Sequence, residues 1–458
     1  MGSGDPRNLT ARFLRGDDAH TALIVRDRAV SYVELRSLVS AHEAELSAQG
    51  VEPGALVPID SKETLHTLVS VLGTWQRGAI AVPLDPGLAP PQRARLLARL
   101  GEGAATGQSS LAGAALLLFT SGSSGEPKGV LLGASGIAKN VAAILDYLPV
   151  ASAERIGLCA PLFYSYGLLG QAMTTLAASA TLVCLLSEPS SEAQVARART
   201  TGVRGLSSVP THLRKLAFYL AEKGETLPLS FCAIAGANLD ESTRALLSER
   251  FGPCTFFHQY GLTEASPRVT AIASTNSRFA AGSVGKPLPG IELRIRDEAR
   301  RTLSPREEGD VHVHSPSVML GYYGDEEATR NAIDAEGFLR TGDRGFLDEE
   351  GYLYLSGRSD GVVKCGGERV GLESVATTLR GLTGVKEAAV VAVPHAELGH
   401  ALVAFVEPEM PVGPLRSRLR ELLSPAQRPS RVIAMPMLPR TSNGKLALAQ
   451  MRALAEGV

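Results

Sequence analysis

The first part of the chain, over residues 22–186, alternates short apolar runs with longer stretches of helical apolar spacing. The run Ala79–Leu84 is typical of a buried strand, since it is short, apolar and followed by turn residues. The range Ser31–Leu46 predicts a helix, because Ser31 and Glu34 form a capping box ahead of the apolar repeat. Strands that alternate with helices in this way predict an α/β fold in which helices cover a mainly parallel sheet.

The pattern changes from Gly282 onward, where glycine, proline and β-branched residues become frequent. Period-two alternation over Glu292–Ile295 and Asp310–His314 predicts an antiparallel, β-rich segment. Beyond Asp360 the predicted elements form a small α+β succession: strand Val362–Lys364, helix Leu372–Leu379, strands Glu387–Val393 and Leu402–Glu407, and helix Pro414–Leu423. We therefore expect two domains, residues 1–359 and residues 360–458.

Composition narrows the classes of partner. Hydrophobic residues make up 44% of the chain and charged residues 20%, which is typical of a globular protein with a sizeable core. The net charge of −1 gives no general attraction to nucleic acid or to an anionic membrane. The run Gly167–Leu186 contains polar residues and predicts a buried helix followed by a buried strand, not a membrane span. The five cysteines lack a CxxC pair, which excludes a zinc ribbon and favours a reducing compartment, so we expect a cytoplasmic protein.

The stretch Thr120–Gly129, TSGSSGEPKG, directly follows the apolar run Leu111–Phe119. A buried strand that ends in a loop rich in glycine, serine and threonine exposes backbone N–H groups and hydroxyls that can wrap a polyphosphate. Lys128 adds a cation that could move with such a loop, although the spacing is not that of a P-loop. A flexible surface linker is the alternative, and the lysine and the flanking strand favour phosphate binding over it.

A second cluster, Gln259–Glu264, follows the predicted strand Cys254–Phe257. Tyr260 offers a flat face on which a base can stack. The hydroxyl of Thr263 and the carboxylate of Glu264 suit a phosphate and a hard cation such as Mg²⁺. A turn followed by a helix cap explains the same residues equally well.

Three further groups of residues suit a nucleotide. In Thr341–Asp343, which we expect in a turn, Asp343 can accept two ribose hydroxyls, and an Asx-turn is the alternative. Arg358, with Asp360 nearby, suggests another ribose contact beside a hinge, and a hairpin turn with surface charges is the alternative. Near the end of the chain an Asn-Gly turn places Lys445 at a loop tip, where a cation can meet developing negative charge. An exposed tail lysine is the simpler explanation of Lys445 alone.

Taken together, five motifs occur in one order: TSGSSGEPKG, QYGLTE, TGD, GRSDGVVKCGG and TSNGK. In these motifs the chain resembles the adenylate-forming superfamily, which contains acyl-CoA synthetases, the adenylation domains of nonribosomal peptide synthetases, and luciferases. The resemblance implies a large N-terminal domain of mixed β-sheets and helices and a small mobile α+β C-terminal domain. It also implies that a carboxylate attacks the α-phosphate of ATP to give an acyl-adenylate and pyrophosphate. A phosphopantetheine thiol then takes the acyl group and expels AMP.

The resemblance implies roles for individual residues. The ATP-binding set comprises Thr120, Ser121, Gly122, Ser123, Lys128, Gly236, Ala237, Tyr260, Gly261, Asp343 and Arg358. Thr263 would contact the α-phosphate, Glu264 would bind Mg²⁺, and Lys445 would stabilise the first transition state. Asp360 would be the hinge about which the C-terminal domain swings between the two half-reactions. After that swing, Lys364 would replace Lys445, and Gly366 and Gly367 would line the thiol channel.

The predicted acyl pocket follows from the same resemblance and contains Tyr164, Ser165, Tyr166, Gly167, Ala235 and His258. Members that activate α-amino acids carry an aspartate where this chain has Ser165, and burying an ammonium group without a carboxylate is unfavourable. A neutral-tailed aryl or short to medium acyl acid is therefore expected, and His258 is either a pocket polar group or a packed histidine. The expected thiol is CoA or a separate carrier protein. The alternatives are a freestanding amino-acid adenylation enzyme and a non-catalytic nucleotide-binding or scaffold protein.

Overall fold

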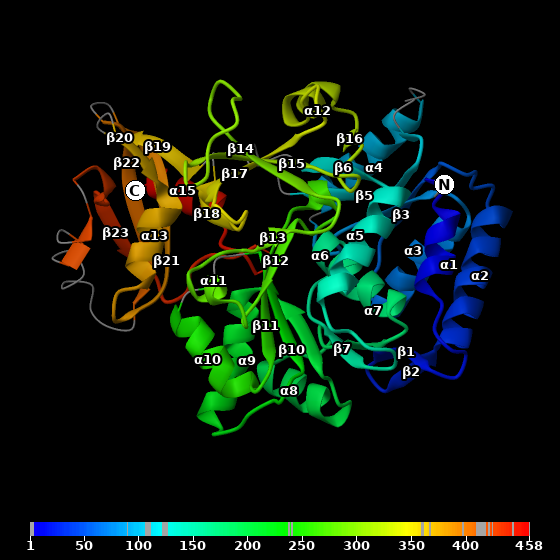
Figure 1. Ribbon diagram of the computed structural model, residues 1–458. Coiled ribbons are helices and arrows are strands. Elements are labelled where there is room, and N and C mark those ends of the chain that lie inside the picture. The colour runs from blue at the N-terminus through cyan, green and yellow to red at the C-terminus, as the bar shows by residue number, and fades with distance from the viewer. Residues whose placement is uncertain are drawn as a thin grey trace. The chain divides into compact units, whose positions relative to one another are not determined.

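The computed structural model of the chain (Figure 1) describes residues 4–88, 90–105, 111–120, 127–236, 239, 241–358, 361–365, 368–395, 398–408, 418–419, 422–423, 425–441 and 444–457. The chain divides into two units, which are described separately below. The larger unit takes in Met1–Gly122, Glu126–Leu293 and Val313–Leu339. The smaller unit contains Arg294–His312 and Arg340–Val458.

The described strands of the larger unit form two sheets. The first has the order β13-β12-β11-β10-β9-β7-β8-β1-β2, and it is parallel from β11 to β1 and antiparallel at both ends. Its strands are β1 (Thr21–Val25), β2 (Arg28–Ser31), β7 (Arg155–Leu158), β8 (Thr181–Cys184), β9 (Gly205–Ser208), β10 (Phe231–Ala235), β11 (Thr255–Tyr260), β12 (Thr270–Ala273) and β13 (Lys286–Pro287). The second has the order β16-β6-β5-β4-β3, with β3 (Leu56–Ile59), β4 (Ile80–Pro83), β5 (Ala114–Thr120), β6 (Lys128–Gly133) and β16 (Gly321–Tyr322).

The predicted α/β class is confirmed, but the strands of residues 22–186 do not share one sheet. The strands β1, β2, β7 and β8 belong to the first sheet, whereas β3 to β6 belong to the second. Apolar periodicity identifies a buried strand, but it does not specify the neighbour to which the strand bonds. The sheet partners are therefore a property of the tertiary structure.

Several helices of the larger unit bury one apolar face. In α3, Leu68, Val71, Leu72 and Trp75 are fully buried, and the Trp75 indole nitrogen donates to the carbonyl oxygen of Ala115 on β5 at 2.7 Å. The helical segments of this unit are α1 (Arg7–Phe13), α2 (Tyr32–Ala48), α3 (Thr64–Gln76), α4 (Pro90–Ala105), α5 (Ala134–Tyr147), α6 (Ser165–Gly167), the π-helical η2 (Leu168–Met173), α7 (Thr174–Ala177), α8 (Ser191–Thr200), α9 (Pro210–Glu222), α10 (Glu241–Phe251), the 3-10 helix η3 (Thr263–Ala265), α11 (Ser277–Ala280) and α12 (Glu326–Ala332). Among the described helices, none is both long enough and apolar enough to span a bilayer.

The predicted capping box at the start of α2 is half formed. The Ser31 hydroxyl accepts a hydrogen bond from the backbone N–H of Glu34 at 3.2 Å, as expected. The Glu34 carboxylate does not complete the box and pairs with Arg28 at 2.5 Å. The helix therefore begins where the sequence predicts, with one of the two expected side-chain contacts replaced by an ion pair.

The smaller unit contains two antiparallel-rich sheets. One has the order β14-β15-β17-β18, formed by β14 (Glu292–Arg296), β15 (Gly309–His314), β17 (Leu339–Leu347) and β18 (Leu353–Arg358). A few end residues of its first three strands are assigned to the larger unit. The other has the order β20-β19-β22-β21, with β23 paired to β22, and it is formed by β19 (Val362–Cys365), β20 (Glu368–Gly371), β21 (Val385–His395), β22 (Gly399–Pro408) and β23 (Arg431–Ala434). The helical segments of the smaller unit include α13 (Leu372–Arg380), the 3-10 helix η5 (Pro425–Gln427) and α15 (Leu448–Glu456).

The core of the smaller unit lies between α13 and the β21–β22 ladder, where Val375, Leu379 and Leu402 are buried. The strands and the helix that the sequence predicts here are confirmed. Most of the predicted helix Pro414–Leu423 lies outside the described residues.

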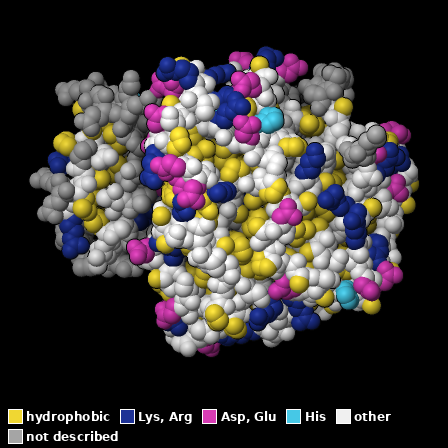
Figure 2. Space-filling model, viewed as in Figure 1, with side chains coloured by type: hydrophobic (Ala, Val, Ile, Leu, Met, Phe, Trp, Pro, Cys, Tyr) yellow, Lys and Arg dark blue, Asp and Glu magenta, His cyan; other side chains and the backbone are white. Residues whose placement is uncertain are grey.

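On the face shown in Figure 2, basic and acidic side chains are interspersed, in keeping with the net charge of −1.

Candidate active site

Thr120 and Lys128 flank the glycine-rich stretch on two paired strands. Thr120 ends β5, Lys128 begins β6, and the two residues lie opposite each other in the antiparallel register. The Thr120 hydroxyl donates to the Lys128 carbonyl oxygen at 3.4 Å. Lys128 is therefore anchored in the sheet, whereas the sequence suggested that it moves with the loop. Ser121, Gly122 and Ser123 lie outside the described residues.

Tyr322 is a residue of this region that the sequence reasoning missed. It lies on β16, which pairs with β6, and its ring centroid is 4.9 Å from the Lys128 ammonium nitrogen. The Tyr322 hydroxyl donates to the Glu264 carboxylate at 3.1 Å. A single tyrosine therefore contacts both the predicted phosphate-binding lysine and the predicted Mg²⁺ ligand. Its signal in the sequence is only a pair of tyrosines between two glycines, which is typical of an ordinary turn.

Thr263 and Ser165 come together although they are far apart in the sequence. Thr263 begins the 3-10 helix η3, and Ser165 begins the short helix α6. Their hydroxyl oxygens are 2.9 Å apart, which is hydrogen-bond distance. The predicted α-phosphate contact and the predicted acyl pocket therefore meet at this pair.

The predicted adenine-binding residues lie at or directly after the carboxyl ends of two neighbouring parallel strands, β10 and β11. The sequence placed Tyr260 after the strand, but β11 extends to Tyr260, which is 8% exposed. Gly236 directly follows β10 with a φ of +86°, a conformation that favours glycine. A side chain at Gly261 would lie 1.9 Å from the Pro267 carbonyl oxygen, so glycine is required there by space. Ala237 lies outside the described residues.

Several residues of the predicted acyl pocket are buried or packed against aromatic rings. Ala235 and His258 are each 4% exposed, and the His258 ring packs at an angle to Phe279 with centroids 6.4 Å apart. Ser165 is equally buried, and the Tyr164 ring lies 4.4 Å from the Phe163 ring. These contacts favour the packed-histidine interpretation of His258, which is compatible with a place in the pocket wall.

A buried arginine stands beside Tyr166, and the sequence reasoning did not identify it. The Arg268 guanidinium lies 5.0 Å from the Tyr166 ring centroid, and Arg268 is only 2% exposed. Burial raises the pKa of the Tyr166 phenol, and Arg268 opposes that rise. Among the described residues, the Arg268 Nε and Nη2 atoms and the Tyr166 hydroxyl have no hydrogen-bond partner.

A Cβ at Gly167 would lie 2.1 Å from the Pro161 carbonyl oxygen, so the chain turns here only with glycine.

In the smaller unit, Asp343 and Arg358 lie directly opposite each other on β17 and β18. The sequence predicted Asp343 in a turn, and this prediction is wrong about the local structure, because Asp343 lies inside β17. Arg358 ends β18, so the alternative of a hairpin turn at Arg358 does not hold, and its predicted ribose contact stays a prediction. The kink that suggested a turn is local to Gly342, whose φ is +77° inside β17. An Arg358 guanidinium nitrogen lies 3.5 Å from an Asp343 carboxylate oxygen, and the Thr341 hydroxyl accepts from the Asp343 N–H at 3.1 Å.

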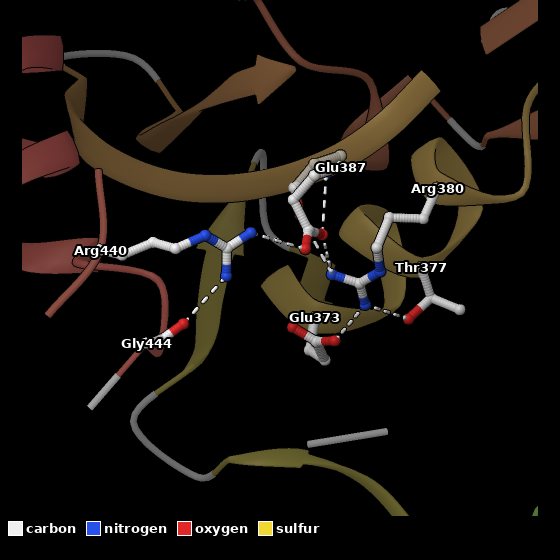
Figure 3. Close-up of polar contacts among 7 residues, drawn as sticks. Glu373, Thr377, Arg380, Glu387, Arg440 and Gly444 are labelled. Atoms are coloured by element: carbon white, nitrogen blue, oxygen red, sulfur yellow. Dashed lines mark hydrogen bonds and ion pairs between the residues drawn. The ribbon is translucent and has the colours of Figure 1, made fainter. Parts of the chain in front are cut away.

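Lys445 is exposed in a tight turn of the smaller unit. The turn is closed by two backbone hydrogen bonds, from Thr441 N–H to the Lys445 carbonyl at 2.8 Å and from Gly444 N–H to the Thr441 carbonyl at 2.9 Å. Gly444 has a φ of +78°, so a glycine fits this position without strain. Figure 3 shows the Gly444 carbonyl facing the guanidinium of Arg440. The predicted hinge residue Asp360 and the channel residues Gly366 and Gly367 lie outside the described residues, as does the side chain of Lys364 on β19.

A resident metal cluster is not found, since no group of three or more His, Cys, Asp or Glu side chains in the described ranges could hold an ion. The donor set around Glu264 instead fits a metal that arrives with its substrate. Mg²⁺ is commonly held by one or two carboxylates together with substrate phosphates. Glu264 has such a carboxylate, and it accepts a hydrogen bond from the Tyr322 hydroxyl.

Comparison with known proteins agrees with this fold and these motifs. The family model described as AMP-binding enzyme matches residues 11–103 and 104–323. The model described as AMP-binding enzyme C-terminal domain matches residues 374–445. The chain belongs to the AMP-binding enzyme family, and the resemblance to adenylate-forming enzymes is confirmed.

Individual relatives match between about three quarters and nearly all of the chain. An octahydroindenyl-propanoyl:CoA ligase from Mycobacterium tuberculosis is 30% identical, and the match covers 97% of each chain. A 2-succinylbenzoate–CoA ligase from Enterococcus faecalis is 30% identical over 74% of this chain and 69% of its own. Among solved structures, an amide bond synthetase from Marinactinospora thermotolerans is 26% identical with a TM-score of 0.86, covering 98% of this chain and 99% of that one.

Proposed function

We propose that this protein is an AMP-forming acid–thiol ligase. It activates a small carboxylic acid with ATP to an acyl-adenylate and then transfers the acyl group to the thiol of CoA. The observation that carries this proposal is the Lys128–Tyr322–Glu264 arrangement, which links a cation and a carboxylate through one tyrosine. The family match and the relatives that are CoA ligases support it.

In the first half-reaction, the residues of the chain position charge. Lys128 and Thr120 bind the β- and γ-phosphates, and Tyr322 holds the Glu264 carboxylate toward the metal. Mg²⁺, when bound with ATP, neutralises charge on the phosphates. Thr263, hydrogen-bonded to Ser165, contacts the α-phosphate as the acid attacks it. Asp343 and Arg358 hold the ribose, and Lys445 stabilises the negative charge that develops in this transition state.

The acid is an aryl or short to medium acyl acid. Tyr164 and Tyr166 supply aromatic surface, and Ser165 supplies no carboxylate to pair with an α-ammonium group. CoA is the acceptor that the CoA-ligase relatives favour, and a separate carrier protein offers the same thiol. One solved relative is an amide bond synthetase, so an amine belongs among the acceptors to be tested.

The test is ATP–pyrophosphate exchange with the purified protein over fatty, aryl and amino acids, followed by acyl transfer to CoA, a loaded carrier protein and simple amines. We expect exchange with an aryl or acyl acid and transfer to CoA. Lys445→Ala should reduce exchange by about 10²–10³, but it should still consume a pre-made acyl-adenylate. Lys223→Ala is the matched control. Lys223 caps the C-terminal end of α9 and belongs to none of the motifs assigned to the site. Exchange only with amino acids would favour the peptide-synthetase alternative. No exchange with any acid would overturn the proposal.

A further inference from the structure

A buried carboxylate of the smaller unit stands between two arginines (Figure 3). Glu387 lies on β21 and is 5% exposed. A guanidinium nitrogen of Arg440 lies 3.2 Å from one Glu387 oxygen, and a guanidinium nitrogen of Arg380 lies 3.9 Å from the other. A buried carboxylate is tolerated only when it is paired, so these arginines account for its presence.

The two arginines are alike in burial but differ in their remaining contacts. Arg380 donates to the Ala388 carbonyl at 3.0 Å and to the Thr377 hydroxyl at 3.0 Å, and it also pairs with Glu373. All of these contacts lie on α13 and β21. Arg440 uses its other nitrogen to donate to the Gly444 carbonyl at 3.0 Å. Gly444 directly precedes Lys445, so Arg440 is the one of these two arginines whose described contacts connect the buried carboxylate to the lysine turn.

A second buried carboxylate binds the backbone just before this turn. Glu407 on β22 is the cross-strand partner of Glu387, and it is also buried. It accepts a hydrogen bond from the Leu438 N–H at 2.6 Å. Two like charges on paired strands repel each other, so each needs its own partner. The segment from Leu438 to Arg440 provides both partners, and it is thereby fixed to the β21–β22 ladder.

The turn is short, so contacts at Arg440 also restrict the position of the residues around Lys445. Arg440 and Leu446 form an antiparallel bridge, and the backbone bonds of Thr441 close the turn between them. The Arg440 guanidinium thus contacts both the Glu387 carboxylate and the Gly444 carbonyl, and this bridging contact is called the brace below. Without the brace, the turn retains its backbone bonds but loses the contact that fixes its carbonyl orientation.

We propose that Arg440, held by Glu387, is a positioning residue that sets the orientation of Lys445 for the adenylation half-reaction. This inference rests on the role of Lys445 under the proposed function. Misplacing a catalytic group by about 1 Å is enough to reduce a rate by about 10²-fold. Arg440 acts through Lys445, so it affects the half-reaction that uses Lys445 and leaves the thiol-transfer half-reaction unchanged.

The test compares Arg440→Met with Arg380→Met, its matched control. Both variants remove one partner of Glu387, and the two arginine side chains are 20% and 19% exposed. We expect Arg440→Met to reduce the kcat of pyrophosphate exchange by about 10- to 100-fold, with transfer from a pre-made acyl-adenylate within about twofold of wild type. Arg380→Met should lower the melting temperature to a similar degree and keep both half-reactions. Equal losses in the two variants, or a loss in both half-reactions, would overturn the inference.

Two further variants keep the test decisive. In Lys445→Ala, adding Arg440→Met should produce no further loss of exchange, because the residue that Arg440 positions is already gone. Arg440→Met with Glu387→Gln removes the buried charge together with its partner, and it should recover part of the melting temperature lost in Arg440→Met but not the lost exchange. If Lys445→Ala alone leaves exchange intact, the proposed function of Lys445 fails. If Lys445→Ala abolishes exchange and Arg440→Met does not reduce it, only the positioning role fails.

Discussion

The ammonium nitrogen of Lys128 lies 4.9 Å from the centroid of the Tyr322 ring, on neighbouring strands of the second sheet of the larger unit. The hydroxyl at the other end of the ring bonds the Glu264 carboxylate. The ring face attracts the cation, and the hydroxyl orients the anion, so one side chain keeps two opposite charges apart and in place. We therefore expect the ring to affect ATP binding and the hydroxyl to affect the Mg²⁺ requirement, so that substitutions can separate the two effects.

Tyr322→Phe keeps the ring beneath Lys128 and removes the hydrogen bond to Glu264. Hydrogen bonds to charged groups contribute about 1.5–3 kcal/mol, so we expect the Mg²⁺ concentration for half-maximal exchange to rise about tenfold while the KM for ATP changes little. Tyr322→Leu removes the ring as well, and it should also raise the KM for ATP. Titrations of pyrophosphate exchange with Mg²⁺ and ATP measure both. The control is Tyr219→Phe, whose ring lies 5.9 Å from Lys223 on α9. A Mg²⁺ requirement unchanged in both Tyr322 variants would contradict this assignment.

Ser165→Ala removes the hydroxyl that lies 2.9 Å from the Thr263 hydroxyl. A neutral hydrogen bond of this kind contributes about 1 kcal/mol, so we expect kcat for exchange to fall about fivefold with little change in melting temperature. Thr263→Val should cause a larger loss, because it removes the group proposed to touch the α-phosphate. Combining the two substitutions should give no more loss than Thr263→Val alone. Fully additive losses in this double-mutant cycle would show that the serine does not act through Thr263.

Gly167→Ala introduces a methyl group where the Pro161 and Ala160 carbonyl oxygens leave 2.1 and 2.5 Å. Backbone atoms cannot rotate away as a side chain does, so the substitution should destabilise the protein by about 3 kcal/mol. The matched control is Gly101→Ala on the exposed face of α4, where nothing lies within 4 Å of the added atom. That control should stabilise the protein by about 1 kcal/mol through helix propensity. Melting temperatures should therefore move in opposite directions for the two glycines.

Stability should fall in mild acid because of His212. Its ring nitrogens lie 2.8 Å from the Ser208 hydroxyl and 2.7 Å from the Gln194 side-chain oxygen. Burial, reinforced by Lys215, lowers the pKa of His212 from 6.5 to about 4. The unfolded chain takes up a proton below pH 6.5 and the folded protein does so only near pH 4, so the free energy of unfolding decreases across this interval.

The contribution of His212 is fully present above pH 6.5 and is lost as the pH approaches 4, with a total of about 3 kcal/mol. Urea denaturation at pH 7.5 and pH 5 measures it. His212→Gln should be less stable than wild type at pH 7.5, yet it should show a shallower decline between the two pH values. An identical decline in wild type and variant would show that other groups cause the acid sensitivity.

Much of the fold and of the site could be predicted locally. Ser31 caps α2 as its spacing indicates, and the apolar runs become buried strands. Thr120, Lys128 and Glu264 could be proposed as site residues from the sequence because their motifs are short and contiguous. Tyr322 and Arg268 were missed, because neither has a neighbour in sequence that indicates its contact. Their roles arise from β16 pairing with β6, and from the Arg268 guanidinium reaching the Tyr166 ring.

The sequence by itself determined the class of protein, because five contiguous motifs and their order do not depend on long-range packing. It also indicated several individual helices and strands, such as α2 and α13, since caps, turns and apolar periodicity act over a few residues. Only the tertiary structure decided that Asp343 and Arg358 face each other across two strands, and that Arg440 bridges Glu387 and the Lys445 turn. Such pairs depend on strand register and burial, which bring together residues that are distant along the chain.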